Sequence, residues 1–297
     1  MALRNSLFAV SGKASFLDAR RDMSGLFVCD KTTMLPIAGI LDRSQDNLVT
    51  GRGDSMSVTV HPFNAVLNRY GALLIQNDGN VNVPLAAAPS SNSRIDVVYV
   101  KQDEKRSPMS DSSDVPTFGV VKGTAAAVPV APAVPNGALA LAQVLLPAGV
   151  SNTAANGVAI TQTYIGAAMK GDMLRVQTSA QRDALTGVPD GMLLHNVADN
   201  CDYVRNGGSW KMKRKTITFG SVGRNTVVGT VENVNNISQV FGVALLGSGS
   251  TIPLPFLHPD YPNRGASFSI STSGQVHILY GSENTLQRGR ITICWEY

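Results

Sequence analysis

A short polar loop near the C-terminus holds the densest set of ligand-type side chains in the sequence. The stretch HPDYPNRG, residues 258–265, supplies His258, Asp260, Tyr261, Asn263 and Arg264. Proteins hold sugars through planar polar groups and aromatic stacking, and arginine pairs with anionic groups. We therefore expect this loop to bind a saccharide or an anionic group. The alternative is an ordinary proline-bounded connection, in which Tyr261 packs inward and Asp260 caps a turn.

Catalytic chemistry has weaker support in this sequence. It contains no G-x-S-x-G, H-E-x-x-H or GxxxxGK motif, and no G-x-G-x-x-G that opens a helix. A polysaccharide-cleaving enzyme would need paired carboxylates across its sugar site. The C-terminal part offers only Glu232, Asp260, Glu283 and Glu296. The four histidines are widely separated, which is typical of structural residues. We expect a non-enzymatic protein, without cofactor or metal.

The net charge of +4 is unevenly distributed along the chain. Residues 211–297 carry eight basic and four acidic side chains, and half of the basic ones lie in the run KMKRK at 211–215. No aromatic residue interleaves with this run, and an alternating strand pattern follows it directly. We interpret it as a solvated strand entry, with contact to an anion as the alternative and no expected role in nucleic-acid binding.

The cysteines and the apolar segments exclude two further classes of protein. Cys29, Cys201 and Cys294 are far apart and odd in number, so neither a zinc site nor a disulfide framework is expected. No run of 18 apolar residues is present, so we expect no membrane insertion. Charged residues make up only 15% of the chain, which favours a β-rich protein whose surfaces are partly covered by other proteins.

The elements that would position these side chains are mostly short strands. SMSVTVHPF at 55–63 alternates apolar and polar residues with the period of a half-buried strand. Asn77-Asp78-Gly79 is a typical hairpin turn, and the stretches at 94–101 and 118–123 predict further strands. The uncharged segment 125–149 contains four prolines. We interpret it as an extended connection followed by a strand, because proline cannot donate to a sheet.

The second half of the chain predicts a connector and a β-rich end. Residues 151–177 predict a strand or extended tie followed by a short helix, and Ser179 is expected to cap a helix that runs through Leu185. Asn206-Gly207-Gly208 predicts a hairpin turn. From 215 onward about seven short strands alternate with turn residues, the pattern of a β-sandwich or jelly roll.

The order of these pieces resembles bacteriophage tail-tip and baseplate proteins of the receptor-binding or upper-baseplate type. One part of the resemblance is an R-x-D-x-V strand at 94–98, followed by the proline-rich run and LALAQVLLPAGV at 139–150. A second part is an R-D-x-L helix at 182–185 and a hairpin that carries Tyr203 and Trp210. The I-x-D-x-R tie expected after LPAG is absent, and AITQTYIG stands in its place.

The resemblance implies a non-enzymatic virion protein, made in the host cytoplasm, that assembles as a homotrimer with other tail proteins. We expect a mainly β, multi-module fold. It comprises an N-terminal β platform at 1–150 that attaches to the tail or baseplate, a short α/β connector at 151–212 and a jelly-roll-like β-sandwich at 213–297. The last module is expected to bind a host surface glycan or another anionic envelope polymer. The alternative is a purely structural baseplate or capsid-surface component that holds another virion protein.

Overall fold

The computed structural model describes residues 15–41, 47–247, 249–255, 266–280 and 286–296 of the chain. The fold is mainly β, as predicted, with several sheets and few helices. The chain divides into two compact units. The first unit comprises residues 1–177 and 187–189, and the second comprises residues 178–186 and 190–297.

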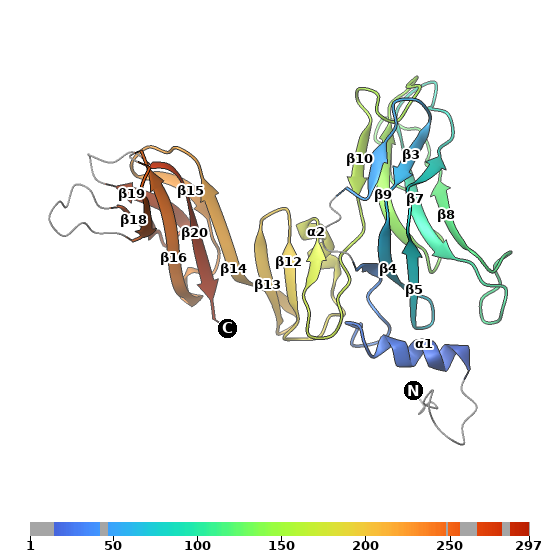
Figure 1. The fold of residues 1–297 in the computed structure, drawn as a ribbon, viewed down its shortest axis with the longest axis horizontal. Coiled ribbons are helices and arrows are strands. Elements are labelled where there is room, and N and C mark those ends of the chain that lie inside the picture. The colour runs from blue at the N-terminus through green and yellow to red at the C-terminus, as the bar shows by residue number, and fades with distance from the viewer. Residues whose placement is uncertain (1–14, 42–46, 248, 256–265, 281–285, 297) are drawn as a thin grey trace, which may run out of the picture. The chain divides into compact units, whose positions relative to one another are not determined.

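The first unit contains one helix and eleven strands among its described residues. In chain order they are α1 (Phe16–Ser24), β1 (Gly39–Ile40), β2 (Val49–Gly51), β3 (Ser57–Val60), β4 (Phe63–Asn68), β5 (Ala72–Asn77), β6 (Val81–Pro84), β7 (Arg94–Gln102), β8 (Pro116–Val121), β9 (Leu139–Leu146), β10 (Ala159–Gln162) and β11 (Leu174–Val176). Antiparallel sheets run in the orders β1-β4-β5, β2-β3-β6 and β10-β9-β7-β8 (Figure 1).

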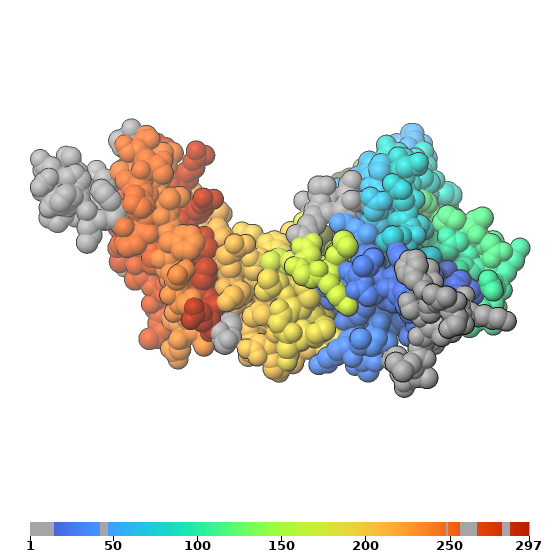
Figure 2. Space-filling view, turned by 60° about the horizontal axis from the view of Figure 1, so that its bottom comes forward, coloured from blue at the N-terminus to red at the C-terminus, as the bar shows by residue number. Residues whose placement is uncertain are grey.

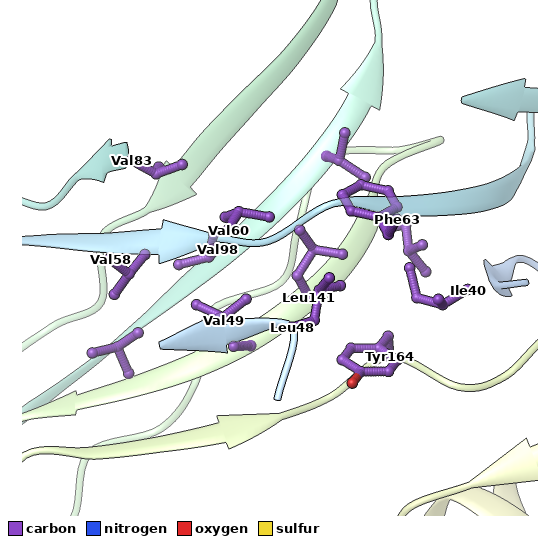
Figure 3. Close-up of a cluster of buried hydrophobic side chains, with 14 of the residues drawn as sticks. Ile40, Leu48, Val49, Val58, Val60, Phe63, Val83, Val98, Leu141 and Tyr164 are labelled. Atoms are coloured by element: carbon purple, nitrogen blue, oxygen red, sulfur yellow. The ribbon is translucent and has the colours of Figure 1, made fainter. Parts of the chain in front are cut away.

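Side chains from all three of these sheets meet in one hydrophobic core (Figure 3). Val58 and Val60 are fully buried, which confirms the alternation expected for this strand. Leu141 and Val98 contribute from the four-stranded sheet, and Phe63 contributes from β4. Burial of several such side chains supplies most of the stabilisation of a unit of this size, at roughly 1.5–3 kcal/mol for each.

Helix α1 was not predicted from the sequence, although its start carries a capping signal. Ser15 accepts a hydrogen bond from the Asp18 backbone N–H, and the Asp18 carboxylate accepts one from the Ser15 N–H. This reciprocal capping box satisfies two backbone donors that the helix leaves open. The serine hydroxyl of Ser24, in the last turn, accepts from the Ala72 N–H and so joins the helix to β5.

One predicted hairpin is wrong, and another takes its place. The turn at 77–79 does not join paired strands, because β5 pairs with β4 while β6 pairs with β3 in a different sheet. The hairpin lies one strand earlier, between Asn68 and Ala72. Its turn places Tyr70 at φ 61° and Gly71 at φ 147°. A tyrosine in the left-handed region is uncommon, so residue propensity does not predict this turn.

The proline-rich segment is the extended connection expected between two strands. It leaves β8, passes through an isolated bridge between Ser93 and Ala126, and enters β9 after a turn at Gly137. Val128 and Val130 within it are about four-fifths exposed, at 82% and 78%. Residues 151–177 contain the expected extended strand, β10, but no helix, so the predicted short helix there is wrong.

The two charged residues of the R-x-D-x-V strand form a buried ion pair in the first unit. Arg94 and Asp96 are both buried, with Arg94 Nε 2.9 Å from Asp96 Oδ1. The same guanidinium donates to the carbonyls of Ala86 and Ala87, and Asp96 accepts from the Gly123 N–H at 2.9 Å. A buried ion pair is tolerated only when its remaining donors and acceptors are satisfied in this way. The pair ties β7 to the chain on both sides of it.

The second unit contains one α-helix, a 3₁₀ turn and nine strands among its described residues. They are α2 (Ser179–Ala184), β12 (Leu193–Asn196), β13 (Cys201–Asn206), β14 (Ser209–Phe219), β15 (Thr226–Thr230), η1 (Val234–Asn236), β16 (Ile237–Leu246), β17 (Thr251–Leu254), β18 (Ala266–Ile270), β19 (Gln275–Tyr280) and β20 (Leu286–Trp295). Its larger sheet has the order β12-β13-β14-β20-β16-β17, and the smaller one has β15-β19-β18.

The two sheets form the expected C-terminal β-sandwich (Figure 1). Ile291, Ile293 and Trp295 alternate along β20 and are fully buried, as their spacing predicts. The Trp295 indole N–H donates to the Glu232 carbonyl at 2.9 Å. The atoms of β16 to β20, coloured orange to red, belong to one continuous body in Figure 2.

The start of the second unit confirms the predicted helix and hairpin with one change. The cap of α2 is Thr178, whose hydroxyl accepts from the Gln181 N–H, and Ser179 is the first helical residue. The turn at Gly207 and Gly208 has two positive φ values and joins β13 to β14, as its residues predict.

The two compact units differ from the three modules predicted by the sequence. The boundary expected at residue 150 falls within the first unit, because β10 pairs with β9 and completes its sheet. The boundary expected at residue 212 falls inside β14, which pairs with β13 at one end and with β20 at the other. The boundary expected at 150 thus lies in a connection within one sheet, and the boundary expected at 212 lies inside a continuous strand.

Candidate ligand-binding face

The loop at 258–265 lies outside the described residues. The structure therefore does not place His258, Asp260, Tyr261, Asn263 or Arg264, and their role in ligand binding stays a prediction. Of the four carboxylates considered for hydrolysis, Asp260 and Glu283 also lie outside the described part. The candidate binding groups that the structure describes in the second unit lie on its strands.

The basic run at 211–215 forms part of β14, in agreement with its interpretation as a strand entry. Three of its charges are engaged locally. Lys213 Nζ donates to the Trp295 carbonyl at 3.1 Å, and Lys215 Nζ donates to the Thr230 carbonyl at 3.0 Å. Arg214 Nη2 lies 2.6 Å from Asp202 Oδ2. The run is therefore a poor candidate for the main anion contact.

Two other arginines lie side by side on the outer surface of the sandwich. Arg288 and Arg290 are both exposed and are separated along β20 by Gly289. Alternate residues of a strand share a face and lie about 7 Å apart. Because the interleaved Ile291 and Ile293 are buried, the arginines belong to the opposite, solvent-facing side of the large sheet. Neither has an acidic partner among the described residues.

The neighbours of these arginines are set by strand register. Arg290 pairs across β20 with Thr218 on one side and Val243 on the other, and Arg288 pairs with Leu245. Leu245 pairs in turn with Thr251 on β17. The outward residues Thr218, Val243, Leu245, Thr251, Arg288 and Arg290 are hereafter called the basic face. They line a hollow of about 500 Å³.

An aromatic ring continues the basic face along β16. Phe241 is two residues before Val243, is 53% exposed and pairs with Thr292. Large exposed apolar side chains of this kind are a common mark of contact surfaces. The combination of two guanidinium groups, threonine hydroxyls and apolar side chains can pair with anionic groups while packing against a sugar ring or an apolar side chain.

The backbone of β20 at Gly289, between the two arginines, packs against the aromatic ring of Phe219. A Cβ placed on Gly289 would lie 2.4 Å from Phe219 Cζ and 2.7 Å from the Val243 carbonyl oxygen. Only glycine fits between the two arginines, because Phe219 is buried directly beneath this point. The backbone between the two arginines is therefore packed closely against Phe219 and β16.

The electrostatic character of the basic face follows from the composition of the sandwich strands. None of the strands β14 to β20 contains an aspartate or a glutamate. The six cations on these strands lie only on β14 and β20. Three cations of the basic run are bonded locally, whereas Arg288 and Arg290 are exposed and have no acidic partner among the described residues, so these two arginines present positive charge that a ligand can reach.

A second polar cluster lies where β12, β13 and β14 pair. His195 Nδ1 is 2.7 Å from Asp202 Oδ1, and the other Asp202 oxygen is held by Arg214. Burial tends to raise the pKa of Asp202, but the hydrogen bond from His195 and the charge of Arg214 outweigh it, so the pKa is lowered. These three side chains are cross-strand neighbours, and the cluster is a charge ladder that binds the three strands.

The thiols and the possible metal ligands offer no competing site. All three cysteines are free, and burial raises the pKa of Cys201 to about 12, so its thiol is protonated at neutral pH. Among the described residues no three His, Cys, Asp or Glu side chains are grouped to hold a metal ion.

The sequence did contain a signal for the basic face. The alternation that identified Ile291 and Ile293 as buried extends backwards and places Arg290 and Arg288 on the opposite side. The basic run at 211–215 is the more obvious signal in the sequence, but three of its charges are engaged locally. The alternation of buried and exposed residues along a strand therefore predicts exposed cations better than the clustering of basic residues in the sequence does.

Within the part of the chain that the structure describes, no helix is long and apolar enough to cross a membrane. Comparison with known proteins found no family model, no curated protein and no solved structure that matches this chain.

Proposed function

We propose that this chain is a non-enzymatic structural protein of a bacteriophage tail tip or baseplate, and that its second unit binds an anionic polymer of the host cell surface. The observation that supports the binding role is the basic face. It is an open sheet surface with two exposed arginines, Arg288 and Arg290, which have no acidic partner in the part of the chain that the structure describes, beside a hollow of about 500 Å³. Guanidinium groups suit the carboxylates and phosphates of envelope polymers, which they can bind in a bidentate manner.

The proposal gives the two units different tasks. The first unit attaches the chain to the tail, and the second unit presents the basic face together with the loop at 258–265. Two arginines give only weak binding, because exposed charge pairs are individually worth little. A homotrimer within a particle that carries many copies converts such weak sites into tight attachment through multivalency.

A purely structural role is the second candidate, and a specific observation favours it. Phe241 and Val243 are exposed at 53% and 37% on the same side of β16. Exposed apolar side chains rimmed by cations also suit a contact with another virion protein. The basic face would then hold an acidic protein surface in place of a polymer.

Binding of the full chain to defined polymers separates these candidates. Polygalacturonate serves as the anionic probe and dextran as the neutral one, with the chain immobilised for biolayer interferometry. We expect binding to polygalacturonate only, and its loss in the Arg288→Glu/Arg290→Glu double variant. Arg224→Glu, which reverses the charge of an exposed arginine elsewhere in the second unit, is the matched control and should bind like the wild type. Equal binding of both polymers, or none of either, contradicts the polymer-binding proposal.

Two further measurements test the assembly that we propose. Immunogold labelling of purified particles should place the chain at the tail tip; label on the capsid would contradict this location. Light scattering of the purified chain should give three times the single-chain mass of 31.4 kDa. A mass of 31.4 kDa would contradict the homotrimer.

A further inference from the structure

The basic face is divided lengthwise into a polar side and an apolar side. Strands β20 and β16 are neighbours in the large sheet (Figure 1), and their register places Arg290 opposite Val243 and Arg288 opposite Leu245. Residues directly opposite each other in an antiparallel pair have their Cβ atoms about 4.5–5.5 Å apart. Each of the two arginines on β20 therefore has an apolar neighbour on β16.

The apolar side extends along β16 and onto β17. Phe241 is 53% exposed, Val243 is 37% exposed, and Leu245 is half-buried. Pro253 on β17 pairs with Val243 and is exposed as well. Proline cannot donate a hydrogen bond to an added strand, so the edge of the sheet at this point is poorly suited to strand addition. A ligand of this region therefore meets apolar side chains rather than a free strand edge.

The polar side lies on β20 and β14. Thr218 pairs with Arg290, and Thr216 pairs with Thr292, with the hydroxyl oxygens of the last two residues 3.2 Å apart. Strands β14 to β20 carry no aspartate or glutamate, so the arginines have no acidic neighbour on these strands. Positive charge and hydroxyl groups thus line one side of the face, which complements an anion that is surrounded by hydrogen-bonding groups.

This division of the face distinguishes between classes of anionic polymer. A polyol phosphate chain carries charge but has no ring, so it would use the arginines and leave Phe241 and Val243 uncovered. An acidic sugar such as a uronate carries its carboxylate at one edge of a ring whose C–H groups form an apolar face. Such a ring can place its carboxylate toward an arginine of β20 while its face packs on the apolar side chains of β16.

The direction of the two sides suits a chain of sugars more than a single sugar. The polar and apolar sides follow neighbouring strands, and alternate residues on one face of a strand lie about 7 Å apart. Arg288 and Arg290 therefore present two cations in succession, beside Leu245 and Val243. The hollow of about 500 Å³ is lined by residues of both strands along this stretch.

From this arrangement we infer that the basic face binds a polymer of acidic sugar rings. The polymer lies along β20 and β16, with carboxylates toward Arg288 and Arg290 and sugar rings against Phe241 and Val243. The inference rests on the proposed function and names the class of polymer that this function would use. It differs from binding by charge alone, because the exposed apolar side chains take part in the choice of ligand.

Biolayer interferometry on the immobilised full chain tests the inference with two anionic probes. Polygalacturonate supplies carboxylates on sugar rings, and sodium polyphosphate supplies a denser run of charge without rings. We expect polygalacturonate to bind more tightly than polyphosphate at the same ionic strength. A face that acts through charge alone would prefer polyphosphate, because closely spaced charges attract the arginines more strongly.

The Phe241→Thr/Val243→Thr variant separates the apolar contribution from the charge. Both side chains are exposed and threonine suits a strand, so the urea transition in tryptophan fluorescence should stay in place. We expect polygalacturonate binding to weaken about fivefold, a usual size for the loss of an aromatic contact, while polyphosphate binding stays unchanged. Val227→Thr is the matched control, since Val227 is 42% exposed on β15 of the smaller sheet. It should bind both probes like the wild type.

Two outcomes would overturn the inference. One is polyphosphate that binds at least as tightly as polygalacturonate, and the other is equal affinity of the Phe241→Thr/Val243→Thr variant and the wild type for polygalacturonate. Either result leaves the proposed binding of anionic polymers standing, provided that the Arg288→Gln/Arg290→Gln variant loses both probes. Absence of binding of both probes to the wild type contradicts the proposed function and the inference together.

Discussion

The buried ion pairs of the first unit and the exposed arginines on β20 of the second unit are two different uses of charge. In the first unit, Arg94 and Asp96 are buried against each other, and Arg20 and Arg69 share the Glu104 carboxylate. In the second unit, strands β14 to β20 contain no acidic residue, and Arg288 and Arg290 are exposed on one face of β20.

Buried ion pairs stabilise the fold, whereas exposed arginines without acidic neighbours are available to bind a partner. A buried pair loses its hydration and is retained only while both partners are present. An exposed arginine contributes little to stability, so substituting it should leave the fold intact. The comparison therefore predicts large stability effects in the first unit, and binding effects without stability effects at the basic face.

The largest expected effect is that of Asp96→Asn. The substitution leaves the buried Arg94 guanidinium without a counter-charge, and we expect a loss of about 3–5 kcal/mol of stability in the first unit. Both tryptophans, Trp210 and Trp295, lie in the second unit. Urea unfolding followed by circular dichroism should therefore show an earlier transition, while the transition in tryptophan fluorescence stays in place.

The matched control for this variant is Asp54→Asn. Asp54 pairs with Arg52 at 2.5 Å, but its side chain is 66% exposed. We expect no measurable change in either transition, since exposed pairs are screened by solvent. Equal effects of the two substitutions would remove the distinction between buried and exposed charge.

A smaller effect is expected from Gly289→Ala. The added methyl group would meet the Phe219 ring, and overpacking of this kind costs about 1–3 kcal/mol. The tryptophan fluorescence transition should move to lower urea concentration. Gly220→Ala is the control, because no atom lies within 4 Å of a Cβ at Gly220. An unchanged transition in Gly289→Ala would mean that Phe219 does not fix the basic face.

The smallest effect concerns the charge ladder at Asp202. Its pKa in the folded chain is lowered from the ordinary value of 3.8, so its carboxylate stabilises the second unit above that value. The contribution is lost as the pH falls through the lowered pKa. The stability advantage of the wild type over Asp202→Asn should therefore be constant near neutral pH and shrink below about pH 3.8. An advantage that grows on acidification would contradict the direction of the shift.

Much of the fold could be predicted because strand alternation reports burial directly. Val58 and Val60 in the first unit, and Ile291, Ile293 and Trp295 in the second, are buried as their spacing requires. The glycine turn at 207–208 was likewise predictable, because its two positive φ values demand glycine.

Other features depend on tertiary contacts that leave little trace in local sequence. The turn at Tyr70 is imposed by its packing on α1, against the preference of tyrosine. Strand β6 pairs with β3 in preference to its sequence neighbour β5, and no local signal selects between the two. Which cations are free for a ligand also depends on tertiary contacts, since Lys213, Arg214 and Lys215 of the basic run find partners on other strands and loops of the unit.

The most direct test of the basic face is the salt dependence of polygalacturonate binding by the full chain. We compare the wild type with the Arg288→Gln/Arg290→Gln variant at 50 and 200 mM sodium chloride. If each arginine neutralises one polymer charge, as cations do on single-stranded nucleic acids, the wild-type affinity should fall about sevenfold across this range. The variant should bind weakly, with little dependence on salt. Equal affinity and equal salt dependence of the two proteins would contradict the assignment of binding to the basic face.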